Sequence, residues 1–335
     1  LVRSITSIDE SLIGGTKVRF VGTGTSGIDH VDTAYLRDAG IHFVDAKGSN
    51  ANAVVDYCFT ALAFATLHRG FSLSGSRVGI VGAGAVGGLF ATKLEELGVE
   101  VRCYDPFLVA AVQGNRKYYS LDEVLECDVV SLHVPLTSAG VHSTLNLIGD
   151  AELTALTKNA ILINACRGGV VDELALKSLL LIREDIMTVF DVWENEPAIE
   201  SSLAQCVDIA TPHIAGYSAE AKSNATKILA LEFERYFRLG AAIEEEDGNE
   251  NPGVLVVEDA PGESALWSTL LTALPLDELS EQFKRALSDG VGTEAFDTFR
   301  QKLLTRREFI SRRLRRDTYS LFQQQQLTVL GFRFE

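Results

Sequence analysis

Three residues in the middle of the chain have the side chains that hydride transfer from an alcohol carbon requires. Arg167 follows the apolar run ILINAC, Glu196 lies in the turn WENEP, and His213 follows the segment IATP. Oxidation of a secondary alcohol needs a base for the hydroxyl proton. Histidine titrates near neutral pH, so it can take that proton and return it in the reverse reaction. We therefore interpret His213 as the base of a dehydrogenase.

The other two residues suit the remaining tasks of such a reaction. Glu196 would hydrogen-bond the far nitrogen of the His213 ring, fix its tautomer and stabilise the imidazolium, with Glu194 as the competing acid in the same turn. Arg167 would hold a substrate carboxylate through two hydrogen bonds and polarise the C2 oxygen, which lysine does poorly. Taken singly, each residue also has a structural interpretation, as a buried histidine, a surface acid or an ion-pair partner.

Other catalytic patterns fail on this chain. It contains no H-E-x-x-H metal motif, and the fourth residue after Tyr217 is Ala221 rather than the lysine of a Tyr/Lys alcohol dehydrogenase. We expect His133 and His142 to be structural.

The catalytic candidates follow the ends of successive predicted strands. Short β-branched runs alternate with helical patterns, which indicates βαβ units and a doubly wound parallel sheet. The predicted strands are Arg77–Val81, Glu100–Tyr104, Asp128–His133, Ala160–Asn164, Met187–Asp191 and Val207–Ala210, and the clearest helices are Val86–Leu97 and Glu173–Ile182. Ligands bind beyond the carboxyl ends of strands in such sheets.

The first strand runs into GAGAVG, which places Gly82, Gly84 and Gly87 in the G-x-G-x-x-G spacing. These glycines permit a tight turn, let backbone N–H groups approach a pyrophosphate and allow close packing of helix on strand. Asp105 ends the next strand, where a carboxylate accepts hydrogen bonds from ribose hydroxyls. Because Pro106 follows rather than a basic residue, this pattern favours NAD over NADP.

The segments on either side predict further domains. Val18–Thr23 and Ile41–Val44 are expected strands of a smaller domain, and Asn50–His68 is an expected helix that begins at an asparagine cap and bridges the domains. Ser218–Leu239 is an expected return helix. The acidic stretch Glu244–Gly253 has the composition of a linker.

The last segment, Val254–Glu335, is expected to form a third small domain, with a strand at Val254–Val257 and a helix at Phe296–Phe309. Its basic run is expected to be a solvated helix face or a subunit contact rather than a ligand site. That run comprises Arg306, Arg307, Arg312, Arg313, Arg315 and Arg316.

The composition excludes several classes of protein. A formal net charge of −16 repels nucleic acid. The longest apolar stretches, such as Ala61–Leu67, are far shorter than the roughly 20 residues of a membrane span. The five cysteines are odd in number and form no C-x-x-C pair, which is typical of reduced thiols in the cytoplasm and argues against a zinc site.

The motifs together resemble the D-2-hydroxyacid dehydrogenase family. They are GAGAVG with Asp105, NACRGGVVDE, DVWENEP and TPHIAGYS. Finer motifs, namely RSIT, GTGTSGIDHVD, NACRG, HIAGYS and FRQKLLTRREF, are similar to the branch of 4-phosphoerythronate dehydrogenases in vitamin B6 biosynthesis, and this similarity spans nearly the whole chain.

The resemblance implies NAD-dependent oxidation of 4-phospho-D-erythronate to 3-hydroxy-2-oxo-4-phosphobutanoate. It implies a flavodoxin-like substrate domain and a C-terminal α+β domain that forms a homodimer. It assigns Arg167 and Glu196 to the active site and makes His213 the proton donor and acceptor. The implied substrate contacts are Ser4, Thr25 and Tyr217, and the implied NAD contacts are Asp105, Asp191 and Gly216. A phosphate also needs a cation, for which Arg3 is our candidate.

We divide the chain into a substrate domain (1–52), an NAD-binding domain (53–215), a return helix (216–240) and a dimerisation domain (254–335). By the resemblance and by ordinary domain size, the first domain is expected to lack about 40 N-terminal residues. This would expose a sheet edge beside Ser4, and we expect weak substrate binding or aggregation for the chain as given.

Two alternative functions stay open at this point. One is another D-2-hydroxyacid dehydrogenase, of the 3-phosphoglycerate or hydroxypyruvate type. The other is a non-enzymatic, NAD-sensing corepressor on the same scaffold.

Overall fold

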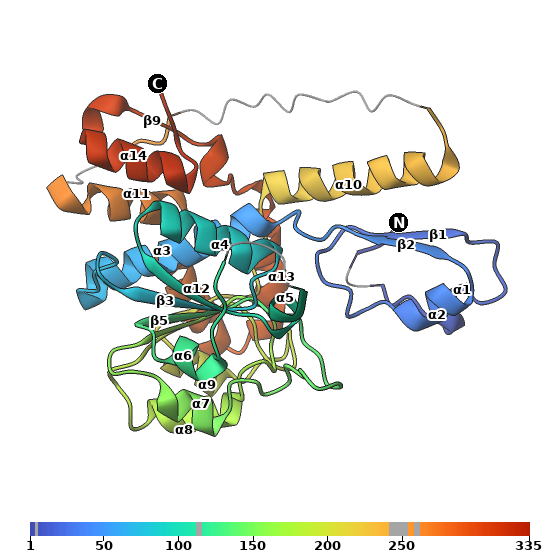
Figure 1. Ribbon diagram of the computed structural model, residues 1–335, viewed down its shortest axis with the longest axis horizontal. Coiled ribbons are helices and arrows are strands. Elements are labelled where there is room, and N and C mark those ends of the chain that lie inside the picture. The colour runs from blue at the N-terminus through green and yellow to red at the C-terminus, as the bar shows by residue number, and fades with distance from the viewer. Residues whose placement is uncertain (4–5, 112–115, 241–253, 258–261) are drawn as a thin grey trace.

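A computed structural model describes residues 1–3, 6–111, 116–240, 254–257 and 262–335. It shows a large lobe built on a central sheet and a small lobe formed by the first part of the chain (Figure 1). Ser4 and the predicted linker Glu244–Gly253 lie outside the described residues. None of the helices in these described ranges is long and apolar enough to cross a bilayer.

The central sheet has six parallel strands in the order β4-β3-β5-β6-β7-β8. Their bounds are β3 Arg77–Val81, β4 Glu100–Tyr104, β5 Val129–Leu132, β6 Ile161–Asn164, β7 Met187–Phe190 and β8 Ile209–Ala210. Each predicted strand is therefore present, with its ends within two residues of the expected ones. The order reverses between β3 and β5, which confirms the doubly wound fold and puts the ligand edge at the carboxyl ends of these strands.

Helices cover both faces of this sheet, which explains why the inner strands β3, β5, β6 and β7 are buried along nearly their whole length rather than at alternate residues. Val78 and Ile80 of β3 face one core cluster and Val81 faces another. The first face is covered by α3 Ala51–Arg69, α4 Ala85–Glu96, α11 Ala265–Ala273 and α14 Leu321–Leu330. The second is covered by α6 Leu121–Leu125, α7 Asp150–Ala155, α8 Glu173–Leu180, α9 Ser201–Cys206, α12 Leu276–Ser288 and α13 Gly292–Lys302. The short α5, Pro106–Ala111, follows β4.

The small lobe contains β1 and β2, which pair in parallel, and the short helices α1 and α2. Their bounds are α1 Glu10–Ile13, β1 Phe20–Thr23, α2 Thr33–Asp38 and β2 His42–Asp45. Ile8, Val21, Val31 and Leu36 form its separate core. The return helix α10, Ala219–Phe237, packs its aromatic end on Phe20, which ties the end of the predicted NAD-binding domain back to this lobe.

The bridging helix α3 begins and ends close to the predicted residues, but its predicted cap is different. Asn50 occupies the N-cap position without making a side-chain capping bond. Its Oδ1 instead accepts a hydrogen bond from the Ser26 hydroxyl at 2.7 Å, so the side chain links α3 to a loop of the small lobe. Gly70 ends the helix at φ 67°, a left-handed conformation that favours glycine.

Two predicted elements of the C-terminal segment are wrong. In place of a strand at Val254–Val257, Val254 makes a single bridge to Arg313. The helix predicted at Phe296–Phe309 instead covers Gly292–Lys302 and ends in a 3-10 turn, Leu303–Thr305. The apolar residues after that turn come from a different element, so their helical spacing was coincidental. The remaining elements are 3-10 turns Gly262–Ser264, Phe309–Ser311 and Arg316–Thr318, and short strands β9 Arg313–Leu314 and β10 Arg333–Phe334.

The interpretation of the basic run as a solvated helix face holds only in part. Arg313, Arg315 and Arg316 are exposed, but none of the six arginines lies on an α-helix, and the alternative of a subunit contact stays a prediction. Arg306 is only 7% exposed, and its guanidinium donates to the backbone carbonyls of Ala53 at 2.7 Å and Ala215 at 3.3 Å. Arg307 pairs with Glu220 on α10. Burial of a guanidinium is tolerated where its donors are satisfied. Arg306 and Arg307 therefore link the C-terminal segment to α3 and α10.

The C-terminal segment shares its core with the NAD-binding domain. Leu270 of α11 belongs to the same cluster as Val55 of α3, and Phe283 and Phe296 of α12 and α13 belong to the cluster under the sheet. Both phenylalanine rings are fully buried. Truncation of such a ring typically costs about 3–5 kcal/mol. The C-terminal segment is therefore packed as a layer of the large lobe, and it shares its core with the NAD-binding domain.

Candidate active site

A cavity of about 520 Å³ lies between the two lobes, at the carboxyl ends of the central strands. It is lined by the predicted catalytic residues, by most of the predicted substrate residues and by two of the predicted NAD contacts, which come from distant parts of the sequence. They are Arg3, Thr25, Arg167, Asp191, Glu196, His213, Gly216 and Tyr217. Its size is in the range of pockets for small ligands.

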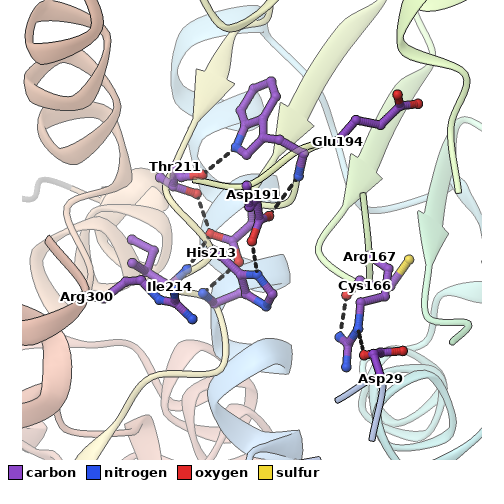
Figure 2. A network of polar contacts seen from close by, with 12 residues as sticks. Asp29, Cys166, Arg167, Asp191, Glu194, Thr211, His213, Ile214 and Arg300 are labelled. Carbon is purple, nitrogen blue, oxygen red and sulfur yellow. Dashed lines mark hydrogen bonds and ion pairs between the residues drawn. The ribbon is translucent and has the colours of Figure 1, made fainter. Parts of the chain in front are cut away.

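His213 and Glu196 form the predicted pair. His213 Nδ1 lies 2.7 Å from Glu196 Oε2, and the other carboxylate oxygen of Glu196 accepts the Trp193 backbone N–H at 2.9 Å (Figure 2). Both side chains remain partly exposed to the cavity, at 29% and 21%. With Nδ1 facing the carboxylate, Nε2 of the ring is left for a ligand. This is the orientation in which a histidine exchanges a proton with a substrate hydroxyl.

Asp191 fixes the backbone that carries His213. Its buried carboxylate accepts the N–H groups of Ile214 and Ala215, each at 2.8 Å, and the hydroxyl of Thr211 at 2.7 Å. His213 itself has φ 55°, the left-handed region that residues other than glycine seldom adopt. The Asp191 hydrogen bonds support this unusual conformation, so the structure gives Asp191 a positioning role. Its contact with NAD stays a prediction.

Arg167 reaches across the cavity to the small lobe. Its Nε donates to Asp29 Oδ2 at 3.0 Å and its Nη1 to the carbonyl of Cys166 at 2.7 Å. Within the described residues Nη2 makes no hydrogen bond. A Cβ on Gly27 would lie 1.8 Å from Nη2, so any side chain at this position would displace the guanidinium from the place it occupies. Sequence analysis missed Asp29 and Gly27, although both lie in the quoted motif GTGTSGIDHVD.

The loops that carry the catalytic residues are packed closely together. A Cβ on Gly168 would lie 1.9 Å from the Trp193 carbonyl oxygen, so glycine is needed where the Arg167 loop meets the Glu196 loop. The Trp193 indole donates to the Thr211 carbonyl at 2.9 Å. The loops that carry the three catalytic candidates therefore support one another, through close backbone packing at Gly168 and through the Trp193 side chain.

The predicted contact residues Thr25, Gly216 and Tyr217 all line the cavity. Thr25 lines the cavity, and its hydroxyl lies 2.8 Å from Thr23 Oγ1 and 2.8 Å from the Gly27 carbonyl. A Cβ on Gly216 would lie 2.3 Å from Asn50 Nδ2, so a larger residue there would displace the amide of Asn50. Tyr217 Oη accepts a hydrogen bond from Arg300 on α13. Arg300 lies in the quoted motif FRQKLLTRREF, but the sequence analysis gave it no role in the site.

The predicted cofactor loop has the geometry that a dinucleotide phosphate needs. Gly82 has φ 90°, and a Cβ on Gly87 would lie 1.9 Å from the Gly82 carbonyl oxygen. Gly84 is the N-cap of α4, with no side-chain cap and open space where its Cβ would be. The first N–H groups of α4 are thus available to an anion. Asp105 accepts the Ala83 N–H at 3.0 Å, and its ribose contact stays a prediction.

His133 and His142 do not line this cavity, and neither forms an ion pair with an acid in the described part of the chain. Burial lowers the pKa of His133 to about 3, so its ring is neutral, with Nε2 2.9 Å from the Ser131 hydroxyl. His142 packs edge-on against Phe107. Both observations agree with structural roles.

The fold and the site match those of known enzymes. The chain is 42% identical over 332 residues to the erythronate-4-phosphate dehydrogenase of Pseudomonas putida (strain W619), which covers 96% of this chain and 87% of the relative. The enzyme of the same name from Chromohalobacter salexigens is 40% identical over 326 residues, 94% and 83% of the two chains. The chain belongs to the erythronate-4-phosphate dehydrogenase family.

The large lobe is also similar to a broader family of dehydrogenases. Residues 62–215 match the family described as D-isomer specific 2-hydroxyacid dehydrogenase, NAD binding domain. The NAD-bound 3-phosphoglycerate dehydrogenase of Entamoeba histolytica superposes with a TM-score of 0.60 at 26% identity, over 72% of this chain and 79% of that one. A D-lactate dehydrogenase from Aquifex aeolicus has the same fold, with a TM-score of 0.57 at 23% identity over 70% and 81%. The chain is an NAD-dependent oxidoreductase of the D-2-hydroxyacid dehydrogenase type.

Glu173 supports the catalytic loop and gives it a pH dependence. Its buried carboxylate accepts the Glu194 N–H at 2.6 Å. Burial, with the nearby charges of Glu194 and Glu196, raises the pKa of Glu173 to about 7 from 4.5. Between these values the folded state keeps a proton that the unfolded chain has released. The contribution of Glu173 to stability therefore falls as pH rises through this window.

We expect Glu173→Gln to be more stable than wild type at pH 8 and equally stable at pH 5. Glutamine keeps the acceptor for the Glu194 N–H and removes the buried charge. Urea unfolding at both pH values measures this, with exposed Glu184→Gln as the control for loss of one negative charge. A gain of the same size at pH 5 and pH 8 would contradict the assignment to Glu173.

Proposed function

We propose that this chain oxidises 4-phospho-D-erythronate to (R)-3-hydroxy-2-oxo-4-phosphooxybutanoate with NAD, as a step of pyridoxal 5′-phosphate biosynthesis. The observation that carries the proposal is the His213–Glu196 pair at 2.7 Å, in one cavity with Arg167. The names of the full-length relatives give the substrate, since they are erythronate-4-phosphate dehydrogenases.

The three catalytic residues have separate tasks in this proposal. Arg167 binds the substrate carboxylate through its free Nη2 and a second donor, and holds the C2 oxygen as its charge changes. His213 Nε2 takes the proton of the C2 hydroxyl, and Glu196 stabilises the imidazolium that forms. NAD, when bound, accepts the hydride from C2, so the products are the 2-oxo acid, NADH and a proton.

The remaining predicted contacts are part of the same proposal. Thr25 and Tyr217 contact the substrate hydroxyls, and Ser4, which lies outside the described residues, is proposed as a further contact by the resemblance alone. Gly216 and Asp191 adjoin the nicotinamide. The glycine loop binds the pyrophosphate, and Asp105 receives the adenosine ribose. Support for these roles comes from the cavity lining and from the open N-terminus of α4.

A substrate panel tests the proposed function. NADH absorbance is followed while the protein oxidises 4-phosphoerythronate, 3-phosphoglycerate, glycerate and lactate, and while it reduces hydroxypyruvate. We expect kcat/KM to be highest for 4-phosphoerythronate. A higher value for 3-phosphoglycerate or hydroxypyruvate would replace the proposed substrate and leave the dehydrogenase assignment in place.

We further propose that the protein is a cytoplasmic homodimer. One supporting observation is that all five cysteines are free thiols, four of them buried and Cys206 exposed. The other is the pair of exposed apolar side chains Leu321 and Phe322 on α14. Large exposed apolar residues at one place on a surface are typical of subunit contacts. Sedimentation velocity of the purified protein measures the assembly state.

A further inference from the structure

Arg300 introduces a cation from the C-terminal segment into the cavity. It lies on α13, and its Nε donates to Tyr217 Oη at 2.8 Å while the guanidinium lies over the Tyr217 ring, 5.1 Å from the centroid. Leu304 and Asp297 from the same segment line the cavity beside it. Residues of the C-terminal segment therefore form part of the cavity wall, although the sequence analysis predicted only a role in dimerisation for this segment.

The charge of Arg300 is not neutralised within the part of the chain that is described. It takes part in no ion pair there, and its Nη1 and Nη2 groups have no hydrogen-bond partner. The lining carboxylate of Asp297 forms no ion pair with it. A guanidinium held by an aromatic ring through one edge presents its other donors in a fixed direction. Such donors suit an anionic ligand group.

Arg300 and Arg167 lie on opposite sides of His213 in the view of Figure 2, and all three residues line the same cavity. The substrate of the proposed function has an anionic group at each end and reacts between them, at C2. If Arg167 holds the carboxylate, the phosphate on C4 is left for a cation beyond His213. A phosphate monoester carries nearly two negative charges at neutral pH and forms strong hydrogen bonds with arginine.

We infer that Arg300 binds the terminal phosphate of the substrate and that Tyr217 positions it for this. The inference rests on the proposed function for the identity of the phosphorylated acid. It makes Arg300 a specificity-determining residue that selects phosphorylated over unphosphorylated hydroxy acids. Arg3 and Lys222, which also line the cavity, then have auxiliary roles.

Ligand binding without turnover tests this inference. The complex of protein and NADH is titrated with 4-phosphoerythronate and, separately, with erythronate. Because NADH and the hydroxy acid are both in the reduced form, no hydride can be transferred between them. We expect Arg300→Met to raise the Kd of 4-phosphoerythronate about 30-fold, as for loss of charge-assisted hydrogen bonds, and to change the Kd of erythronate less than threefold. Arg300→Lys is expected to fall between wild type and Arg300→Met, because lysine is a point charge without the planar fork.

Exposed Arg285→Met on α12 is the matched control, since it removes the same charge outside the cavity. An equal loss of affinity for both acids, or no loss for either, would overturn the role of Arg300. Equal binding of the two acids by the wild-type protein would overturn it as well. Failure of the wild type to oxidise 4-phosphoerythronate would instead refute the proposed function, because the binding measurement does not depend on turnover.

Discussion

Replacement of His213 by glutamine is expected to lower kcat about 1,000-fold, within the usual range for loss of a general base. The glutamine side chain reaches the same region and can still hydrogen-bond Glu196, but it cannot accept the proton of the substrate hydroxyl. Affinity for NADH should stay within threefold of wild type, because His213 is assigned to proton transfer. Steady-state kinetics and NADH fluorescence titration measure the two quantities.

His68→Gln serves as the control for this substitution. His68 is exposed in the last turn of α3 and does not line the cavity. A comparable loss of NADH affinity in His213→Gln would make His213 a structural residue of the β8 loop. An unchanged kcat would remove it from the reaction.

The second large effect is expected at Arg167. Arg167→Met should lower kcat/KM about 1,000-fold, because two charge-assisted hydrogen bonds to the substrate carboxylate and C2 oxygen are lost. The substitution also removes the partner of Asp29 and leaves that carboxylate facing an anionic substrate. Arg167→Lys should recover only part of the loss, since an ammonium group cannot reproduce the two-pronged geometry.

Arg37→Met is the matched control for Arg167→Met. Arg37 forms an exposed pair with Asp38 in the small lobe, and such pairs contribute little to stability. Its kcat/KM should equal that of wild type. Full activity of Arg167→Lys would indicate that charge alone matters at this position, which contradicts a bidentate role.

Local patterns in the sequence were sufficient for the central sheet and for the chemistry of the site. The glycine loop and the strands of the large lobe were predicted because they depend on neighbouring residues: β-branched runs, turns and the alternation of strand with helix. His213, Glu196 and Arg167 could be grouped because parallel strands end at one edge of a sheet. The turn WENEP supplies two acids as partners for His213, and only the tertiary structure decides for Glu196 over Glu194.

The C-terminal segment was predicted poorly for the opposite reason. Its helix α13 was placed too late because Phe309 happens to continue the apolar spacing of Phe296 and Phe299 past a 3-10 turn. Arg306 was taken as solvated because an arginine-rich run usually is, whereas two backbone carbonyls on other elements satisfy its donors. Contacts of this kind join residues far apart in the chain and leave no local signature.

The sequence by itself determined the reaction type and the cofactor, and it supplied the residues that we propose exchange the proton and hold the carboxylate. Those features follow from side-chain chemistry and from the period of strands and helices, which are properties of short stretches of chain. Only the tertiary structure decided that Asp191 supports the strained backbone of His213, that Asp29 meets Arg167 across the cavity, and that α13 brings Arg300 onto Tyr217. Each of these depends on how separate elements pack, because a hydrogen bond between distant residues is set by the burial of the apolar surfaces that bring them together.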